Sequence, residues 1–141
     1  MKTEQRHWTE SKGWISESGE ANLKDAQLVL VFGSPSHIQN KGLFDEIRQS
    51  YPQAYILGGS SAGEIYDIHV HENSLSVTAI FFEQTTLASA HKSIKSENSF
   101  SVGEELVHSL PLEGLRHIFV LADGLNTNGT ELMKGMSKHL P

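Results

Sequence analysis

The sequence Ala-Tyr-Ile-Leu-Gly-Gly-Ser-Ser-Ala-Gly-Glu at residues 54–64 carries the clearest structural signal in the chain. Its apolar first part is typical of a buried strand, and its glycine- and serine-rich second part is typical of a tight turn. Such a turn lets the backbone approach a bound group closely, while its N–H and hydroxyl groups stay free to bind it. Because α/β proteins usually place ligands at the ends of buried strands, the stretch predicts a ligand-binding loop. A purely structural connection between strands is the alternative.

Composition limits the kind of protein that this chain can be. Its 141 residues are enough for one domain with a buried core. Seventeen acidic residues oppose eleven basic ones, without a Lys/Arg cluster, so nucleic acid and anionic membranes are not expected partners. The absence of cysteine excludes disulfides, thiolate nucleophiles and cysteine-based zinc sites. No apolar run approaches membrane length, so we expect a cytoplasmic protein. We also expect neither a cofactor nor a metal.

Sequence on either side of the opening stretch predicts an α/β fold. The apolar residues 28–32 suit a central strand covered on both faces, and residues 41–50 have the apolar spacing of an amphipathic helix. Together with a strand over 54–58 they form a βαβ unit with a right-handed crossover. We therefore expect a mixed β-sheet with flanking helices, in which this βαβ unit is followed by an antiparallel meander and a second strand–helix unit.

The later elements follow from shorter patterns. Ser101 and Glu104 form a capping-box pattern that predicts a helix from 101 to about 110. A buried strand is expected at 118–122 and a last helix at about 130–139. The predicted meander has strands at 64–71, 75–83 and 86–94.

The polar residues 1–27 are expected to form an irregular N-terminal arm that places Trp8 and Trp14 on the domain, which then spans 28–141. An aromatic lid over a pocket is the functional alternative for the two tryptophans.

An internal similarity relates the two ends of this domain. A shift of 89 positions places residues 28–52 on 117–141 without a gap, and strand, loop and apolar helix face agree in phase. In the first copy, the residue after the proline opens the strand that carries the glycine loop, whereas the second copy ends at Pro141. We therefore expect the chain to be a fragment or a short variant that lacks a second such strand.

Four segments of the chain carry a family resemblance: LVLVFGSP at 28–35, YPQAYILGGSSAGEI at 51–65, SLSVTAIFFEQT at 74–85 and FVLADGLNTNGTEL at 119–132. Together they resemble the N-terminal domain of the FIST family. Gly59 and Ser61 stand where that family usually has a cysteine and a threonine, so a role for that thiol is excluded here, and Ala122 replaces a serine of the family's second motif. The resemblance implies a sensory domain that binds a small ligand, with amino acids as one candidate class. It also implies a C-terminal FIST domain or signalling output domain in the full-length protein.

The candidate ligand contacts lie at three strand ends. An amino acid would offer a carboxylate to the amides of 58–63 and an ammonium group to Asp123, because the two loops have opposite chemistry. Turn formation and helix capping by Asn128 or Thr130 are the alternative for the second loop. The candidate residues are Ser34, Gly58, Gly59, Ser60, Ser61, Gly63, Glu64, Asp123, Gly124, Asn126 and Asn128.

Two other classes of function remain open from the sequence. Residues 59–63 match the G-x-S-x-G pattern of serine hydrolases, with Ser61 as nucleophile, but that pattern requires a following helix and the sequence here is strand-like. A ligand-free interaction module is the other class, and an unpaired strand edge would favour a homodimer.

One further pattern concerns the strand after the loop. Asp67, His69 and His71 share one face of the predicted strand and could chelate a metal. The ordinary interpretation is a solvated face, with Tyr66, Ile68 and Val70 on the buried one.

Overall fold

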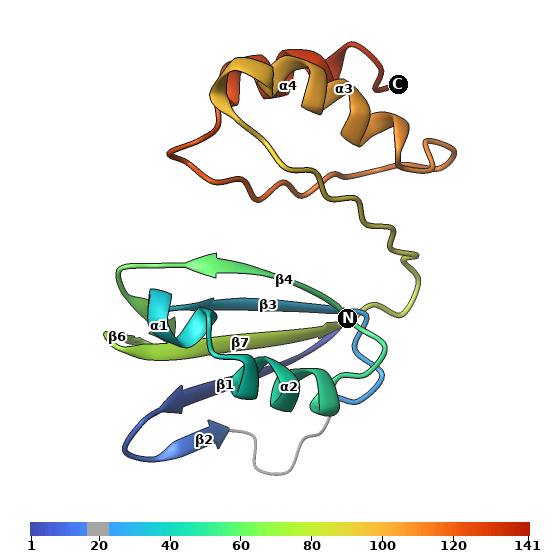
Figure 1. Cartoon of the computed structure of the whole chain (residues 1–141). Coiled ribbons are helices and arrows are strands. Elements are labelled where there is room, and N and C mark those ends of the chain that lie inside the picture. The colour runs from blue at the N-terminus through green and yellow to red at the C-terminus, as the bar shows by residue number, and fades with distance from the viewer. Residues whose placement is uncertain (17–22) are drawn as a thin grey trace. The chain divides into compact units, whose positions relative to one another are not determined.

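The computed structural model describes residues 1–16 and 23–141, and the remaining part of the predicted arm, 17–22, lies outside the described residues (Figure 1). The chain divides into two compact units, residues 1–86 and 87–141. Each unit has its own apolar core.

A mixed five-stranded sheet forms the first unit and confirms the expected α/β fold. Its order is β2-β1-β7-β3-β4, and only the β3–β4 pair is parallel. The strands are β1 (Lys2–Thr9), β2 (Gly13–Ser16), β3 (Leu28–Gly33), β4 (Tyr55–Ser60) and β7 (Ser74–Phe81).

The predicted βαβ unit is present. Helix α2 (Lys41–Ser50) has the expected bounds and connects β3 to β4, preceded by the short helix α1 (Pro35–Ile38). The side chain of Asn40 caps α2 by accepting hydrogen bonds from the backbone N–H groups of Gly42 at 2.9 Å and Leu43 at 3.3 Å. The cap fixes where the helix begins, and Pro52 follows its end.

One face of the sheet forms the core of this unit. Strand β3 buries Val29 and Val31 there, and α2 buries Leu43 and Ile47 against them. The alternate residues of β3, such as Leu30, point to the other face and are half-buried within this unit. Other core members are Ala26, Tyr51, Ala54, Leu75, Val77 and Ala79.

An irregular conformation for the N-terminal residues is also wrong, because β1 and β2 form a hairpin within the sheet. Strand β1 pairs with β7 from Lys2 opposite Phe81 to Thr9 opposite Ser74. The sequence does not indicate this strand, because its two buried side chains, Glu4 and His7, are polar and give no apolar alternation. Trp8 and Trp14 do pack against the core, as expected of residues that attach this segment to the domain.

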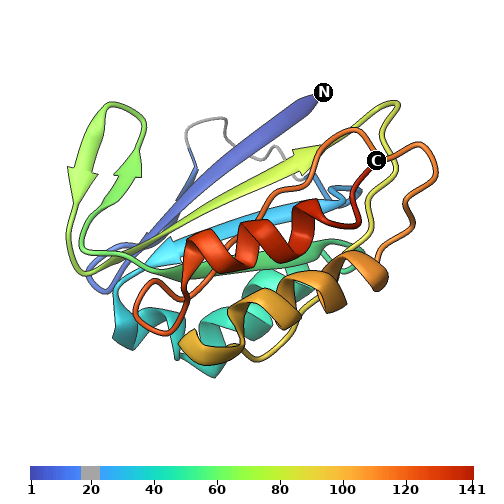
Figure 2. The same cartoon turned by 90° about the horizontal axis from the view of Figure 1, so that it is seen from above.

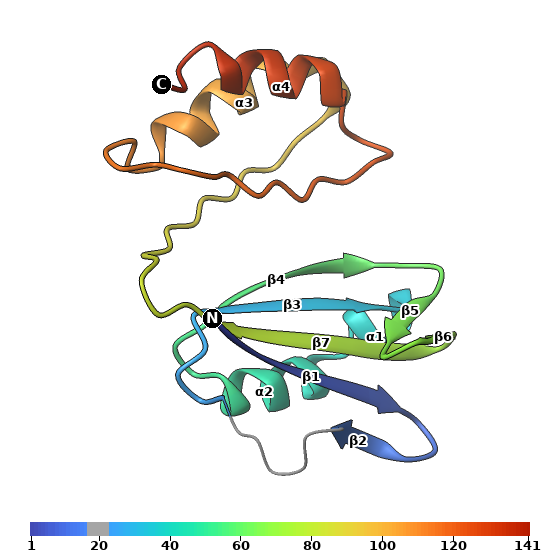
Figure 3. The ribbon, with the colours of Figure 1, turned by 180° about the vertical axis from the view of Figure 1, so that it is seen from behind.

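The predicted three-stranded meander is wrong. Strands β5 (Glu64–Tyr66) and β6 (His69–His71) form a separate two-stranded hairpin, whereas β7 inserts between β1 and β3 of the large sheet. The hairpin lies at the end of the sheet where β7 begins (Figure 3). Residues 86–94 form no strand, because no neighbouring segment in the described chain pairs with their backbone.

The second unit is a pair of helices joined by extended chain (Figures 1 and 2). Helix α3 (Ser99–His108) follows a 3₁₀ turn, η1 (Ser96–Asn98), and α4 (Gly129–Ser137) packs on it. The capping role of Ser101 is wrong, since α3 begins at Ser99 and the Ser101 hydroxyl donates to the Asn98 carbonyl. The buried residues of this pair include Val102, Val107, Leu132 and Met136.

The strand predicted at 118–122 is absent from the structure. The segment is extended but pairs with no strand in the described residues, and Phe119 is 63% exposed. Its apolar, branched residues satisfy the local pattern of a strand, but a strand also requires a partner for its N–H and C=O groups. The second strand–helix unit is therefore present only as its helix.

Candidate functional site

The carboxyl ends of the parallel strands β3 and β4 lie side by side. Gly33 is opposite Ser60 in the ladder, and the backbone N–H of Ser61 donates to the carbonyl of Gly33 at 2.9 Å. This pairing brings Ser34, directly after β3, next to the loop that follows β4. The structure thus places seven of the candidate residues at this end of the sheet: Ser34, Gly58, Gly59, Ser60, Ser61, Gly63 and Glu64.

Glu64 is a buried carboxylate that fixes the glycine loop. Its side chain is 2% exposed and accepts hydrogen bonds from the hydroxyls of Ser61 at 2.9 Å and Ser74 at 2.6 Å. The carbonyl of Ser74 in turn accepts from the backbone N–H of Ser34 at 3.2 Å. Because hydrogen bonds to a charged acceptor are strong, this network holds the ends of β3 and β4 and the beginnings of β5 and β7 in one arrangement.

A serine–histidine contact adjoins this network. The Ser34 hydroxyl lies 2.6 Å from Nδ1 of His37 and 3.2 Å from the Ser36 hydroxyl. His37 is the third residue of α1, and its ring and that of Trp8 meet edge to face with centroids 4.9 Å apart. Sequence reasoning missed His37. The signal was the spacing in Ser34-Pro35-Ser36-His37, which places a histidine one helical turn after the serine that precedes the helix.

An apolar pocket of about 170 Å³ lies between the helices and the strands of the βαβ unit. Gly58 belongs to its wall, and a Cβ atom there would come within 1.9 Å of the Val31 carbonyl oxygen. His37 supplies the imidazole in an otherwise apolar lining. The lining residues are Val31, His37, Ile38, Leu43, Phe44, Ile47, Ile56, Gly58 and Leu75.

Polar groups border this pocket. Ile56, Gly58 and Ser60 alternate along β4 and therefore share one face of the strand. Two of them line the pocket, so the hydroxyl-bearing residue Ser60 continues the same row toward the glycine loop. The bond between Ser34 and His37 supplies a second polar group next to the pocket.

Comparison with known families shows to which family the chain belongs. The FIST N domain model matches residues 27–141. The chain belongs to the FIST N domain family. No curated protein and no solved structure matches it. Domains of this family serve as sensory domains in signal transduction. In the part of the chain that the structure describes, no helix combines the length and apolarity needed to cross a bilayer.

The second candidate loop of this FIST N domain lies in its other unit and is folded onto itself. The Asp123 carboxylate accepts from the N–H of Leu125 at 2.9 Å and from the side-chain amide of Asn126 at 2.6 Å. These bonds, that of Asn126 foremost, hold the pKa of the Asp123 carboxyl below its ordinary value. Asn128 caps α4 by accepting from the N–H of Glu131 at 3.2 Å, as the capping alternative predicts. Gly124 is exposed between them.

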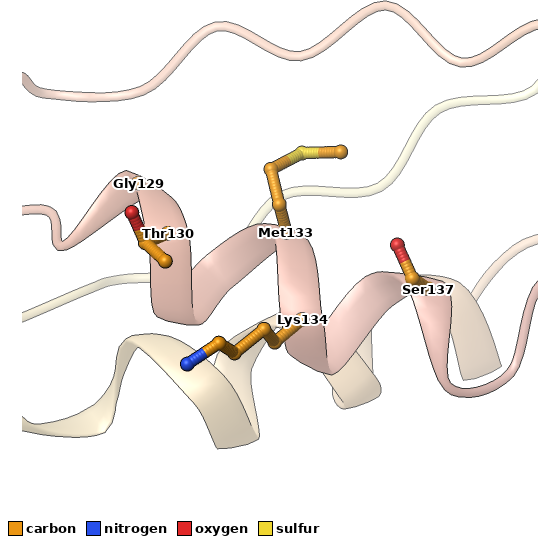
Figure 4. Close-up of a pocket in the computed structure, with 5 residues that line it drawn as sticks. All are labelled: Gly129, Thr130, Met133, Lys134 and Ser137. Carbon is orange, nitrogen blue, oxygen red and sulfur yellow. The ribbon is translucent and has the colours of Figure 1, made fainter.

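Helix α4 also carries an open hollow on its outer face. Figure 4 shows five residues along this face, with the side chains of Met133 and Ser137 pointing away from the helix on the same side. The opposite face, with Leu132 and Met136, is buried. The outer hollow is shallow and open, so we do not regard it as a binding site. Its lining residues are Gly129, Thr130, Met133, Lys134 and Ser137.

The histidine pattern after the loop agrees with the expectation only in part. Asp67 lies in the turn between β5 and β6 with φ 53° and is therefore not part of a strand face. His69 and His71 do share one face of β6, as expected, and their ring centroids lie 6.3 Å apart. The predicted buried face is wrong for Ile68 and Val70, which are 83% and 72% exposed. No group of three His, Cys, Asp or Glu side chains among the described residues could hold a metal ion.

Proposed function

We propose that this FIST N domain is a sensory domain that binds a small ligand at the carboxyl ends of β3 and β4. The observation that carries the proposal is the apolar pocket bordered by polar groups of Ser34, His37 and Ser60. Ligand sites in α/β proteins usually combine an apolar cavity with a few convergent polar groups, at the carboxyl edge of parallel strands. A C-terminal FIST or output domain of the full-length protein would then read the bound state.

The dimensions of the pocket favour a ligand with a compact apolar part. A dry cavity of about 150 Å³ lined by Leu, Ile and Phe is known to accept benzene, so a leucine or phenylalanine side chain is a suitable occupant. No Lys or Arg belongs to the lining, which disfavours an anionic group inside the pocket. We therefore propose an amino acid with an apolar side chain, whose polar backbone groups meet the serine hydroxyls at the rim.

A thermal-shift panel of the twenty amino acids tests this proposal. Leucine or phenylalanine should raise the melting temperature of the wild type, because a ligand at a hundred times its Kd adds about 2.7 kcal/mol to the free energy of unfolding. Ile56→Phe fills the pocket and should remove the shift. Ile65→Phe is the matched control, since Ile65 is 66% exposed on β5 and lies outside the pocket lining. A panel without any shift, or an equal shift in Ile56→Phe, would contradict the proposal.

Hydrolysis is a second candidate function, and one specific observation supports it. The contact of 2.6 Å between the Ser34 hydroxyl and His37 Nδ1 is that of a nucleophile and its base. Ser61, the residue in the G-x-S-x-G pattern, instead donates to Glu64 and is followed by β5 rather than by a helix. Turnover of generic esters that is lost in Ser34→Ala and kept in Ser61→Ala would support this candidate. Absence of turnover in the wild type would reject hydrolysis. Of the two functions, we propose ligand binding without catalysis.

A further inference from the structure

His7 is a buried titratable residue in the middle of β1. Its side chain is 2% exposed, and its Nε2 atom has no hydrogen-bond partner among the described residues. Side chains alternate between the two faces of a strand, so His7 points away from the face on which Arg6 bonds to Ser50 of α2. It lies instead beneath the β5–β6 hairpin.

Aromatic contacts join His7 to both strands of this hairpin. Its ring stacks on Tyr66 of β5, with centroids 4.9 Å apart and planes at 16°, and meets His71 of β6 at 4.3 Å. Three hydrogen bonds complete the attachment of the hairpin to the sheet: Ser74 Oγ to Glu64, Ser76 Oγ to the Ile65 carbonyl at 3.2 Å, and the Asp67 N–H to the Gln5 side chain at 3.2 Å.

The outer face of the hairpin is apolar and exposed. Its outer face carries Ile65, paired with Val70 across the ladder, and the turn residue Ile68, all exposed. A two-stranded hairpin is marginally stable by itself, and a segment with few buried apolar contacts opens at low free-energy cost. The contacts of the His7, Tyr66 and His71 rings therefore make up a large part of what keeps it on the sheet.

The groups that face His7 oppose its protonation on balance. Burial lowers the pKa of His7 most. His71 and Lys12 of the β1–β2 turn lower it further, and the Glu64 carboxylate raises it. Tyr66 of β5 contributes its ring, and Ser76 of β7, opposite His7 in the ladder, does not titrate. A proton on His7 would have no hydrogen-bond acceptor at Nε2 in the closed arrangement.

We propose that His7 and His71 form a proton-responsive latch, which holds the β5–β6 hairpin on the sheet at neutral pH and releases it when His7 takes up a proton. Release exposes His7 to water and moves Glu64, the first residue of β5, away from the hydroxyls of Ser61 and Ser74. The glycine loop then loses the carboxylate that fixes it. The latch depends only on this chain and operates whether or not the proposed ligand binds.

Hydrogen exchange of the full chain, followed by NMR at about pH 7.5 and about pH 5, tests the latch. Protection factors of amides at 64–71 should fall by up to about 30-fold at the lower pH, because the open state takes up a proton near 6.5 and the closed state does so less readily. Protection in α2 should stay unchanged, which separates local opening from global loss of structure.

Two variants and a control complete the test. His7→Phe keeps the ring stack on Tyr66 and removes the titrating group, so the pH response of the hairpin should disappear. His71→Phe removes the second imidazole and should reduce the response. It replaces His7→Phe as the test variant if His7→Phe does not fold. His69→Phe, at an exposed position of the same hairpin, should retain the full response. Equal protection at both pH values in the wild type, or an undiminished response in both His7→Phe and His71→Phe, would overturn the proposal.

Discussion

Gly58 lies so close to Val31 of the neighbouring strand that a Cβ atom at position 58 would come within 1.9 Å of the Val31 carbonyl oxygen. The two residues are opposite each other in the parallel β3–β4 ladder. No side chain fits between a strand and its neighbour's carbonyl at that distance, so glycine at 58 sets how closely the two strands approach. The same contact shapes one wall of the candidate pocket.

Gly58→Ala should therefore be strongly destabilising. Separating β3 from β4 costs about 3 kcal/mol, at the upper end of what overpacked substitutions usually lose. Both tryptophans of the chain, Trp8 and Trp14, lie in the first unit, so urea unfolding followed by tryptophan fluorescence reports on this unit.

Gly63→Ala is the matched control for this prediction. A Cβ atom there meets the Val70 side chain at 3.1 Å, and Val70 is exposed and free to move. Its cost should stay below about 1 kcal/mol, as for other substitutions that leave the core intact. Similar losses in both variants would mean that the approach of the two strands is not what Gly58 provides.

Ser74→Ala should destabilise the same unit through Glu64. The Ser74 hydroxyl donates to the buried carboxylate at 2.6 Å, and its removal leaves that oxygen without a donor. Hydrogen bonds to charged groups contribute about 1.5–3 kcal/mol, which is the expected loss in urea unfolding. Ser60→Ala, at an exposed position of β4, should change the free energy of unfolding by no more than about 0.5 kcal/mol. A Ser74→Ala variant as stable as Ser60→Ala would show that the network is not needed for stability.

The sequence predicts the βαβ unit well because its signals are local. The bounds of α2 follow from the spacing of Leu43 and Ile47 and from the cap at Asn40. The strand at 118–122 has an equally strong local pattern and is nevertheless absent, because pairing is a property of two segments. Conversely, the sequence does not predict β1, because one of its buried side chains is the polar Glu4. Its hydrogen-bond donor, the N–H of Leu23 at 2.8 Å, lies in a distant part of the sequence.

The same distinction applies to the candidate site. The sequence indicates Ser34, Ser61 and Glu64, and the structure brings them together through the parallel register of β3 and β4. The sequence does not indicate that Glu64 is buried against Ser74, ten residues further on. That contact arises because β7 pairs within the large sheet and so brings Ser74 next to Glu64. Hydrogen-bond partners that the strand order of a sheet brings together cannot be predicted from composition or from residue spacing.

Asn128→Ala tests whether the second loop acts as a cap. Loss of the bond to the Glu131 N–H should cost about 1 kcal/mol and speed hydrogen exchange in the first turn of α4. Asn126→Ala is the control, because its amide bonds only to the exposed Asp123 carboxylate and not to the helix. A variant that weakens amino-acid binding while α4 exchange stays unchanged would instead assign Asn128 to a ligand.

The stability of the first unit should fall on acidification because of His7. The unfolded chain takes up a proton on this residue near pH 6.5, whereas the folded chain does so only at a lower pH, since burial and His71 lower the pKa of the folded-state imidazole. Between these two pKa values the unfolded state binds more protons, so the free energy of unfolding decreases as the pH falls below about 6.5. This contribution is fully present above that pH and is lost progressively below it.

Urea unfolding at a series of pH values, monitored by tryptophan fluorescence, measures this dependence. His7→Phe should be less sensitive to pH between neutrality and the folded-state pKa, because the group that titrates differently in the two states is gone. His69→Phe keeps His7 and should follow the wild type, since His69 is exposed. If His7→Phe and the wild type lost stability in parallel on acidification, other groups would account for the pH dependence. The protonation of His7 would then not be the cause of the decrease in the free energy of unfolding.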